Sequence, residues 1–326
     1  MSPAGGPTVW EYLVGAGGTA FVITFLTTRW MIRHLSRTRM VGRDIHKPGQ
    51  PTVPEMGGLA VIAGFYAGVT VVQLYALDTQ TLSYLHASMV AVFGAGFVGL
   101  LDDLFDLRQR VKAVLPFVFA IPLATVAFRD PFGTTLLNVN VGALVLLAIP
   151  FGITAAANAA NMLEGFNGLG AGLGIIMCGA MIVLSFISPT HDFTGLYIIV
   201  PLLAALAGFL YFNRYPARIF PGDSMTLFTG AALAAAAIIS HQKTYGAILF
   251  LPFIAEFILK ARGRFRGENY GTLNGDFGLT YEGPTESLSH ALMKWRRLTE
   301  SQIVVILWGL EAVVSAAVIL AALAGL

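Results

Sequence analysis

Acidic side chains gather at the end of one apolar segment. Asp102, Asp103 and Asp106 would lie within about one helical turn of one another. Like charges at that separation repel unless a cation or a proton intervenes, and Asp at a helix C-terminus opposes the helix dipole. A solvated helix end is the simpler interpretation, but it leaves this cost unexplained. Carboxylate oxygens suit Mg²⁺ bound jointly with phosphate groups, and Lys112 could pair with a phosphate as a point charge.

A second polar stretch separates two strongly apolar segments. It contains Asn158, Asn161, Glu164 and Asn167, followed by Gly168. Polar side chains at membrane depth are costly and usually face a cavity or one another. A helix cap and a glycine turn would account for Asn167 and Gly168 alone. Asn158 and Asn161, three residues apart, exceed what one cap needs, so they are candidates for binding.

Two isolated carboxylates and a basic run complete the set of candidate residues. Asp223 and Glu55 each stand just before an apolar segment, where either one alone would be an ordinary helix N-cap. Cations alternate along a later loop, at Lys260, Arg262, Arg264 and Arg266. Part of this charge would only set membrane topology, but beside the acidic and amide clusters it also predicts an anion clamp.

The composition shows that membrane helices must hold these side chains. Hydrophobic residues make up 56% of the 326 residues, charged residues only 12%, and the mean hydropathy is +0.72. Soluble domains carry roughly 25% charged residues. The net charge of +2 gives no indication of nucleic-acid binding. The single cysteine, Cys178, excludes a disulfide framework and a zinc site, and we expect it to serve packing.

We predict ten membrane spans, each of about 20 mainly apolar residues. They cover about 9–31, 57–77, 84–101, 112–128, 139–157, 169–188, 194–212, 224–240, 244–260 and 301–325. The first is not a signal peptide, because its positive charge follows the apolar part. Of the 20 Lys and Arg residues, 18 fall in loops on one side of these spans, with Arg129 and Lys243 on the other. Positive charge stays cytoplasmic, so both termini are predicted to lie outside.

The sequence therefore predicts an all-α, polytopic integral membrane protein with its active site on the cytoplasmic face. It would be a multi-pass protein of the cell membrane, or of the endoplasmic reticulum membrane in a eukaryote. Residues 1–326 form a single transmembrane catalytic domain, with cytoplasmic loops at about 32–56, 102–111, 158–168, 213–223 and 261–300. No internal repeat stands out, which weighs against transporters built from two inverted halves.

Five blocks in order along the chain resemble a known family. They are DIHKPGQPTVPEMGG (44–58), GLLDDLFDLRQRVK (99–112), NAANMLEGFNGLGAG (158–172), FNRYPARIFPGD (212–223) and SHQKT (240–244). In these blocks the chain resembles the polyprenyl-phosphate N-acetylhexosamine-1-phosphate transferases. It is most similar to the UDP-N-acetylglucosamine–dolichyl-phosphate N-acetylglucosamine-1-phosphotransferase branch. The ten-helix architecture of that family agrees with the predicted spans.

The resemblance implies a reaction and its partners. N-acetylglucosamine-1-phosphate would pass from UDP-N-acetylglucosamine, or another UDP-N-acetylhexosamine, to a polyprenyl or dolichyl phosphate within the lipid bilayer. UMP would be released, and the lipid-diphosphate-sugar would start glycan assembly such as N-glycosylation. Mg²⁺, with Mn²⁺ as the alternative, would bridge the diphosphate. No nucleic acid is expected as a partner, and the oligomeric state stays open, with a homodimer among the alternatives.

The same motifs imply roles for individual residues. Asn161 and Asp223 would be the metal ligands. Asp102 and Asp103 match the aspartate pair of the family, with Asp102 as the base or as the group that orients the lipid phosphate, and Lys112 would contact phosphate.

Other residues are expected to bind the substrate. Asn167 and Glu55 would line the nucleotide-sugar pocket, and Arg264 and Arg266 align with the Arg-x-Arg pair of the branch. Asp106 and Asn158 are further substrate-binding candidates. The only histidine of the last cytoplasmic loop is His290, which argues against the branches that carry a histidine-rich motif there.

Two other function classes compete with this interpretation. Asp102-Asp103-x-x-Asp106 also fits the DDxxD motif of Mg²⁺-dependent intramembrane prenyltransferases, although Asp223 alone does not supply their second aspartate-rich motif. A cation-coupled transporter would place ionisable residues near mid-membrane. Here only Glu256 and Glu311 fall inside predicted spans.

Overall fold

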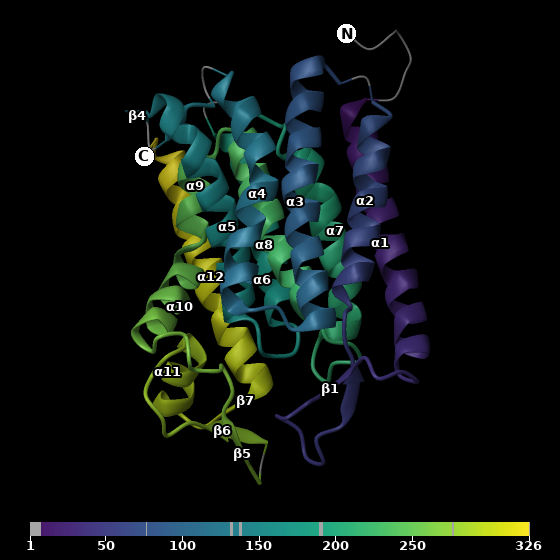
Figure 1. Cartoon of the computed structure of the whole chain (residues 1–326), viewed down its shortest axis with the longest axis vertical. Coiled ribbons are helices and arrows are strands. Elements are labelled where there is room, and N and C mark those ends of the chain that lie inside the picture. The colour runs from purple at the N-terminus through teal and green to yellow at the C-terminus, as the bar shows by residue number, and fades with distance from the viewer. Residues whose placement is uncertain are drawn as a thin grey trace.

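The fold is a bundle of long helices arranged roughly side by side (Figure 1). The computed structural model describes residues 8–75, 77–130, 133–136, 139–188, 192–275 and 277–325. The helices are α1 Val9–Leu35, α2 Gly58–Gln73, α3 Thr79–Phe105, α4 Gln109–Phe128, α5 Val145–Leu163, α6 Leu169–Ile187, α7 Leu196–Asn213, α8 Gly222–Ile239, α9 Lys243–Leu249, α10 Leu251–Arg262, α11 Leu288–Trp295 and α12 Glu300–Leu323, with a short 3-10 helix η1 at Gly142–Leu144.

Short antiparallel strands occur only in the loops of the described residues. They are β1 Val41–Arg43, β2 Thr52–Pro54, β3 Thr135–Leu136, β4 Val139–Asn140, β5 Thr272–Asn274, β6 Gly278–Thr280 and β7 Leu298–Thr299. β1 pairs with β2, β3 pairs with β4, and β6 lies between β5 and β7. The all-α prediction for the membrane part is therefore confirmed.

Every predicted span overlaps a helix or a helix pair, although the fifth span, predicted at 139–157, corresponds to α5 at Val145–Leu163. Within the described residues, eight helices are long and apolar enough to cross a membrane. The predicted ninth span is broken into α9 and α10, bent by 56°. Pro252 stands at the start of α10, where a residue without an N–H group and with a fixed φ favours such a break. The remaining span, α2, has 16 residues and is short for a crossing.

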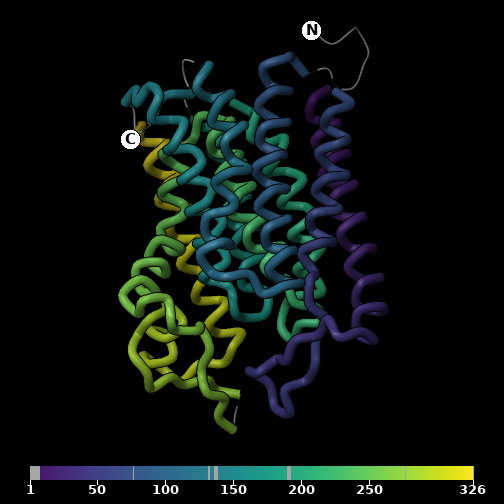
Figure 2. Tube along the Cα trace, viewed as in Figure 1, coloured from purple at the N-terminus to yellow at the C-terminus, as the bar shows by residue number. Residues whose placement is uncertain are grey.

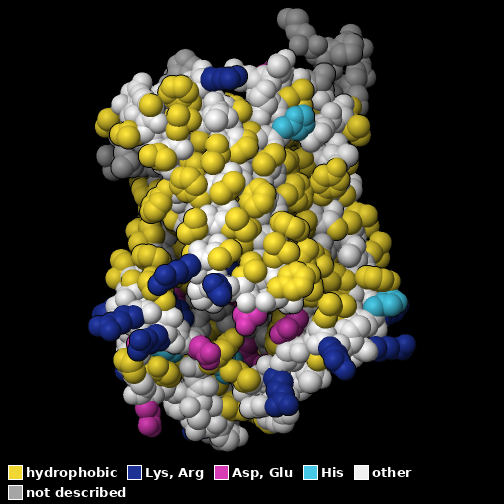
Figure 3. Space-filling view, viewed as in Figure 1, with side chains coloured by type: hydrophobic (Ala, Val, Ile, Leu, Met, Phe, Trp, Pro, Cys, Tyr) yellow, Lys and Arg dark blue, Asp and Glu magenta, His cyan; other side chains and the backbone are white. Residues whose placement is uncertain are grey.

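Charge divides the bundle into two ends. α1 begins and α12 ends at one end, and the other end carries β1, α11 and the β5–β7 sheet (Figure 1). The tube trace shows the loops around 36–57 and 263–299 meeting at this second end (Figure 2). An apolar band separates the two ends, and most of the visible Lys and Arg side chains lie at the second end (Figure 3). We call it the charged end; that it is cytoplasmic stays a prediction.

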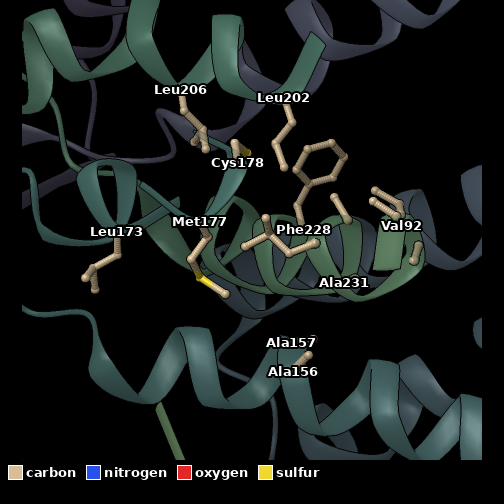
Figure 4. Close-up of a cluster of buried hydrophobic side chains, with 14 of the residues drawn as sticks. Val92, Ala156, Ala157, Leu173, Met177, Cys178, Leu202, Leu206, Phe228 and Ala231 are labelled. Atoms are coloured by element: carbon tan, nitrogen blue, oxygen red, sulfur yellow. The ribbon is translucent and has the colours of Figure 1, made fainter. Parts of the chain in front are cut away.

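The core forms around α8, whose side chains are buried along most of its length. Phe228 and Ala231 of α8 lie among Val92 of α3, Leu202 of α7 and Cys178 of α6 (Figure 4). Cys178 is a free, buried thiol, which confirms its packing role. Small residues allow close helix contact here, since a Cβ on Gly230 would lie 2.3 Å from the carbonyl oxygen of Ala156.

Histidine and carboxylate side chains tie loops together at the end opposite the charged one. His241 Nδ1 lies 2.8 Å from Asp192 Oδ2, and His241 Nε2 lies 3.3 Å from Asp130 Oδ2. Tyr84 donates its hydroxyl to the same Asp130 oxygen at 2.7 Å. Lys243 donates to the carbonyl oxygens of Gly133 and Thr135. These contacts connect three loops of the chain with α3.

Candidate active site

Lys112 joins two of the predicted acidic residues at the charged end. Its Nζ donates to Asp102 Oδ2 at 2.8 Å and also pairs with Asp223 Oδ2. The Lys112 and Asp102 side chains are only 10% and 12% exposed, whereas that of Asp223 is 29% exposed. The ends of α3, α4 and α8 therefore meet at one ammonium group with a partly open face.

The turn between α3 and α4 explains how Asp102 and Lys112 come together. Asp106 ends α3 in the left-handed conformation, with φ 50°, and the chain reverses over Leu107 and Arg108. Asp102 Oδ1 accepts the backbone N–H of Leu107 at 2.9 Å. Asp106 itself is exposed, and among the described residues its side chain has no hydrogen-bond partner. Asp106 therefore ends α3, and its side chain does not join the ion pairs of Lys112 with Asp102 and Asp223.

Asp103 caps the N-terminus of α8. Its two carboxylate oxygens accept the backbone N–H groups of Asp223 at 2.7 Å and Ser224 at 3.1 Å. Gly222 has φ +70°, and a Cβ there would lie 2.6 Å from Asp103 Oδ2. A Cβ on Gly99 would lie 2.3 Å from the Asp223 carbonyl oxygen. These glycines let α3 approach α8 closely, so Asp103 fixes the position of Asp223.

The two predicted asparagines of α5 differ in their environments. Asn158 Nδ2 donates to the carbonyl oxygens of Ala113 at 3.1 Å and Thr154 at 2.8 Å. It therefore ties α5 to the turn of α4 that carries Lys112. Asn161, by contrast, has a buried Nδ2 without a hydrogen-bond partner among the described residues. Its amide is free to turn its oxygen toward a ligand.

Asn161 and Asp223 lie at similar depths in the bundle. α5 and α8 are antiparallel and touch where Gly230 meets Ala156 and Ala157. At about 1.5 Å per residue, both Asn161 and Asp223 lie between that contact and the charged end. Figure 3 shows acidic side chains in a hollow of this end.

Glu55 adds a further carboxylate to the acidic group. Burial, followed by the neighbouring Asp103 carboxylate, raises the pKa of Glu55. Its side chain lies over Gly42, where a Cβ would come within 2.0 Å of Oε1. Strand β1 thus holds Glu55 beside the start of α8; its role in a nucleotide-sugar pocket stays a prediction.

A divalent cation fits this donor set. No group of three or more His, Cys, Asp or Glu side chains suited to a metal occurs in the part of the chain that the structure describes. The predicted pair is instead one carboxylate, Asp223, and one amide, Asn161, both of which provide hard oxygen donors. Of the cationic side chains described, only Lys112 forms an ion pair with Asp102 or Asp223. Excess negative charge at this centre favours a further cation.

Asn167 lies in the turn between α5 and α6 and is buried. Its Nδ2 donates to Asp44 Oδ2 at 3.1 Å and its backbone N–H to Glu300 Oε1 at 2.7 Å. Gly168, with φ +84°, donates its N–H to Asn213 Oδ1. The turn is therefore held from three other segments of the chain.

Arg264 and Arg266 are exposed on the turn that follows α10. Arg264 is left-handed, with φ 55°, and Lys260 Nζ closes the turn by donating to the Gly267 carbonyl oxygen at 2.6 Å. Neither arginine forms an ion pair with a described residue. Three residues beyond Arg266, Asn269 donates to the carbonyl oxygens of Met162 and Glu164. The segment that carries the predicted anion clamp is thus attached to the turn between α5 and α6 through Asn269. The Arg264 and Arg266 side chains themselves are not bound to that turn.

Comparison with known proteins identifies the chain. A model of glycosyl transferase family 4 matches residues 84–241. A protein of Saccharolobus solfataricus, named for UDP-N-acetylglucosamine–dolichyl-phosphate N-acetylglucosaminephosphotransferase activity, is 41% identical over 302 residues, which are 90% of this chain and 92% of the relative. The chain belongs to glycosyl transferase family 4.

More distant family members support the same assignment. The phospho-N-acetylmuramoyl-pentapeptide-transferase of Frankia casuarinae is 32% identical and covers 74% of this chain and 79% of its own length. The UDP-N-acetylglucosamine–dolichyl-phosphate N-acetylglucosaminephosphotransferase of Schizosaccharomyces pombe is 30% identical over 54% of this chain and 44% of its own. The family 4 match contains Asp102, Lys112, Asn161 and Asp223, whereas Glu55 and the Arg264–Arg266 pair lie outside it.

The sequence did not predict several buried residues of this family 4 site. Asp44, Lys47 and Glu300 surround Asn167. Glu164, which the sequence did show in the polar stretch, follows Asn161 by three residues, and burial raises its pKa to about 7. His46 stacks on Phe166 with ring centroids 5.0 Å apart. The block 44–58 could have pointed to part of this group, because Asp44, His46 and Lys47 lie within four positions of one another in the sequence.

Proposed function

We propose that the charged end transfers N-acetylglucosamine-1-phosphate from UDP-N-acetylglucosamine to dolichyl phosphate or another polyprenyl phosphate. The Saccharolobus and Schizosaccharomyces relatives carry that reaction in their names. The observation that carries the proposal is the Lys112 ammonium between Asp102 and Asp223. This cluster brings one ammonium group and two carboxylates to the place where the diphosphate and the lipid phosphate would meet.

The reaction exchanges one phosphorus–oxygen bond for another. An oxygen of the lipid phosphate attacks the β-phosphorus of the nucleotide sugar. The bond from that phosphorus to the bridging oxygen breaks, and UMP leaves with the electron pair. Such chemistry depends mainly on positioning and on stabilising negative charge. We propose direct in-line attack, with no covalent enzyme intermediate.

Each side chain has a role that follows from its contacts. Asp102 orients the lipid phosphate or accepts its proton, while Lys112 pairs with a phosphate oxygen as a point charge. Asp103 holds Asp223 at the start of α8. Asn161 and Asp223 would bind Mg²⁺, or Mn²⁺, which supplies charge neutralisation on the diphosphate. Glu55 and Asn167 line the nucleotide-sugar pocket, and Arg264 and Arg266 reach the diphosphate from the exposed turn after α10.

The prenyltransferase alternative is not favoured by the geometry. The DDxxD mechanism needs its aspartates to share one metal. Here Asp103 is engaged at the α8 N-terminus and Asp106 is exposed at a helix end.

We place the charged end in the cytoplasm, because 18 of the 20 Lys and Arg residues belong to its side. A homodimer stays a prediction.

The test is UMP release by purified full-length protein in lipid nanodiscs. The assay would supply polyprenyl phosphate, Mg²⁺ and a panel of UDP-sugars. We expect release with UDP-N-acetylglucosamine only when the lipid phosphate is present. No UMP release with any UDP-sugar, or release that does not depend on the lipid phosphate, would contradict the proposal.

A further inference from the structure

Four buried polar residues from three distant segments meet beside the active site. Asp44 and Lys47 belong to the loop between α1 and α2, Asn167 to the turn between α5 and α6, and Glu300 to the first turn of α12. Their exposed fractions are 4%, 8%, 6% and 3% in that order. None of them forms part of the Asp102–Lys112–Asp223 centre.

The contacts among them close into a ring. Glu300 Oε1 accepts the backbone N–H of Asn167 at 2.7 Å, and Glu300 Oε2 accepts from Lys47 Nζ at 3.3 Å. Lys47 also pairs with Asp44, whose Oδ2 accepts from Asn167 Nδ2 at 3.1 Å. Asn167 is thus held through both its main chain and its side chain.

Such a ring is costly unless it fixes a geometry. Burying two carboxylates and an ammonium carries a desolvation penalty that apolar residues would avoid. A fully satisfied polar network, however, specifies one arrangement of the groups it contacts. The turn needs such support, because Gly165 and Gly168 lie on either side of Asn167 with positive φ angles of 153° and 84°. Glycine leaves the backbone there free to adopt other conformations.

The ring also determines which side of the amide is presented. Because one N–H of Asn167 Nδ2 is bound to Asp44, the orientation of the amide is fixed, and Oδ1 is presented as an acceptor beside the second N–H. A substrate N–H or O–H group would meet an acceptor already fixed in place. Pre-organisation of this kind lowers the cost of binding.

We propose that Glu300, Lys47 and Asp44 are positioning residues that hold Asn167 in one orientation toward the nucleotide sugar. Helix α12 then influences substrate binding through Glu300, which holds Asn167 in place. This inference rests on the proposed function, in which Asn167 lines the nucleotide-sugar pocket. The part that concerns the ring alone can be tested without substrate.

The first test is hydrogen–deuterium exchange of the full-length protein in nanodiscs. Glu300→Ala should raise the exchange rate of the Asn167 amide about tenfold or more, because its acceptor is lost. Glu300→Gln keeps the size and one oxygen acceptor, so a smaller local increase is expected even if the alanine variant folds poorly. Glu282→Ala, at an exposed carboxylate of the same end, is the matched control. Unchanged exchange at residues 165–170 in both Glu300 variants would overturn the proposal.

The second test is a double-mutant cycle in the UMP-release assay. Glu300→Ala should raise KM for UDP-N-acetylglucosamine about tenfold with kcat nearly unchanged, as expected when uniform binding is lost. In an Asn167→Ala background the same change should add less than about twofold. Additive effects, or a loss of kcat alone, would mean that Glu300 does not act through Asn167. If the wild type releases no UMP, the proposed function fails, while the exchange experiment still decides whether the ring holds Asn167.

Discussion

The carboxylate of Asp103 accepts the backbone N–H of Asp223 at 2.7 Å, across 120 positions of sequence. The same carboxylate also accepts the N–H of Ser224. The end of α3 therefore sets where α8 begins. Because Asp223 lies at that first turn, Asp103 contributes to the site by placing another residue.

Asp103→Asn should lower kcat for UMP release about tenfold or more, since a misplaced catalytic group loses transition-state stabilisation. An asparagine keeps one acceptor oxygen but turns its NH₂ group toward a backbone N–H. Asp78→Asn is the matched control, because Asp78 caps α3 at the opposite end and also accepts two backbone N–H groups. That control should leave both the melting temperature and kcat close to the wild-type values, kcat within about twofold, because asparagine is about as good an N-cap as aspartate. Equal kcat losses in the two variants would contradict the role of Asp103.

Gly222→Ala should lower the free energy of unfolding by about 2 kcal/mol, since it forces a Cβ into a left-handed residue. The new Cβ would also lie 2.6 Å from Asp103 Oδ2. Denaturant unfolding monitored by tryptophan fluorescence would measure the change. Gly152→Ala, in an open stretch of α5 with no atom within 4 Å of the new Cβ, should be neutral or slightly stabilising. Similar losses for both substitutions would show that the close approach of α3 and α8 is not rigid.

Removal of divalent cations should lower the melting temperature of the wild type. A ligand present at about 100-fold its Kd stabilises the folded state by about 2.7 kcal/mol, and a chelator would abolish this gain. Asp223→Asn and Asn161→Ala should each weaken the Mg²⁺-dependent shift. A full shift in both variants would place the metal elsewhere.

The end opposite the charged one should make stability depend on pH through His241. The hydrogen bond to Asp192, together with the charges of Asp192 and Asp130, raises the pKa of His241. The protonated form is therefore favoured in the folded state. Its contribution is complete below about pH 6.5, the ordinary histidine value, and is lost as the pH rises through the raised pKa.

Thermal unfolding of the wild type and His241→Gln across pH 5 to 9, a range of about two units on either side of the histidine pKa, isolates this effect. The melting temperature of the wild type should exceed that of the variant at low pH, and the difference should shrink toward alkaline pH. Other titrating groups, such as His46, whose pKa burial lowers to about 4, cancel in the difference. A difference that grows with pH would contradict the assignment.

The sequence predicted the elements well because their signals are local. Apolar length located a helix or a helix pair for each predicted span, although α2 is short for a crossing, and the placement of the Lys and Arg residues put Asp102, Asn161 and Asp223 at one end. The break at Pro252 was missed because proline is tolerated inside other spans, such as α4 and α7. Whether a proline stays within a continuous helix or stands at a break depends on the residues packed around it in the folded protein.

Contacts between distant residues could not be predicted in the same way. Lys47 and Glu300 are separated by 253 positions, and Glu300 resembles an ordinary acidic residue in the first turn of a helix. Asp103 was predicted to be catalytic and Asn158 to bind substrate; in the structure their side chains are bound to backbone groups of α8, α4 and α5. Residue type indicated the site, but only the packing of α3 against α8 separates ligand-binding groups from those that hold them.

The most direct test of the account is single-turnover UMP formation by the wild type, Asp223→Asn and Asn161→Ala. Each protein would be saturated with polyprenyl phosphate, Mg²⁺ and UDP-N-acetylglucosamine. We expect both variants to lose about 100-fold or more in rate, as is typical when a group that stabilises developing charge is removed, with wild-type folding by circular dichroism. Turnover near the wild-type rate in either variant would contradict the assignment of the active site.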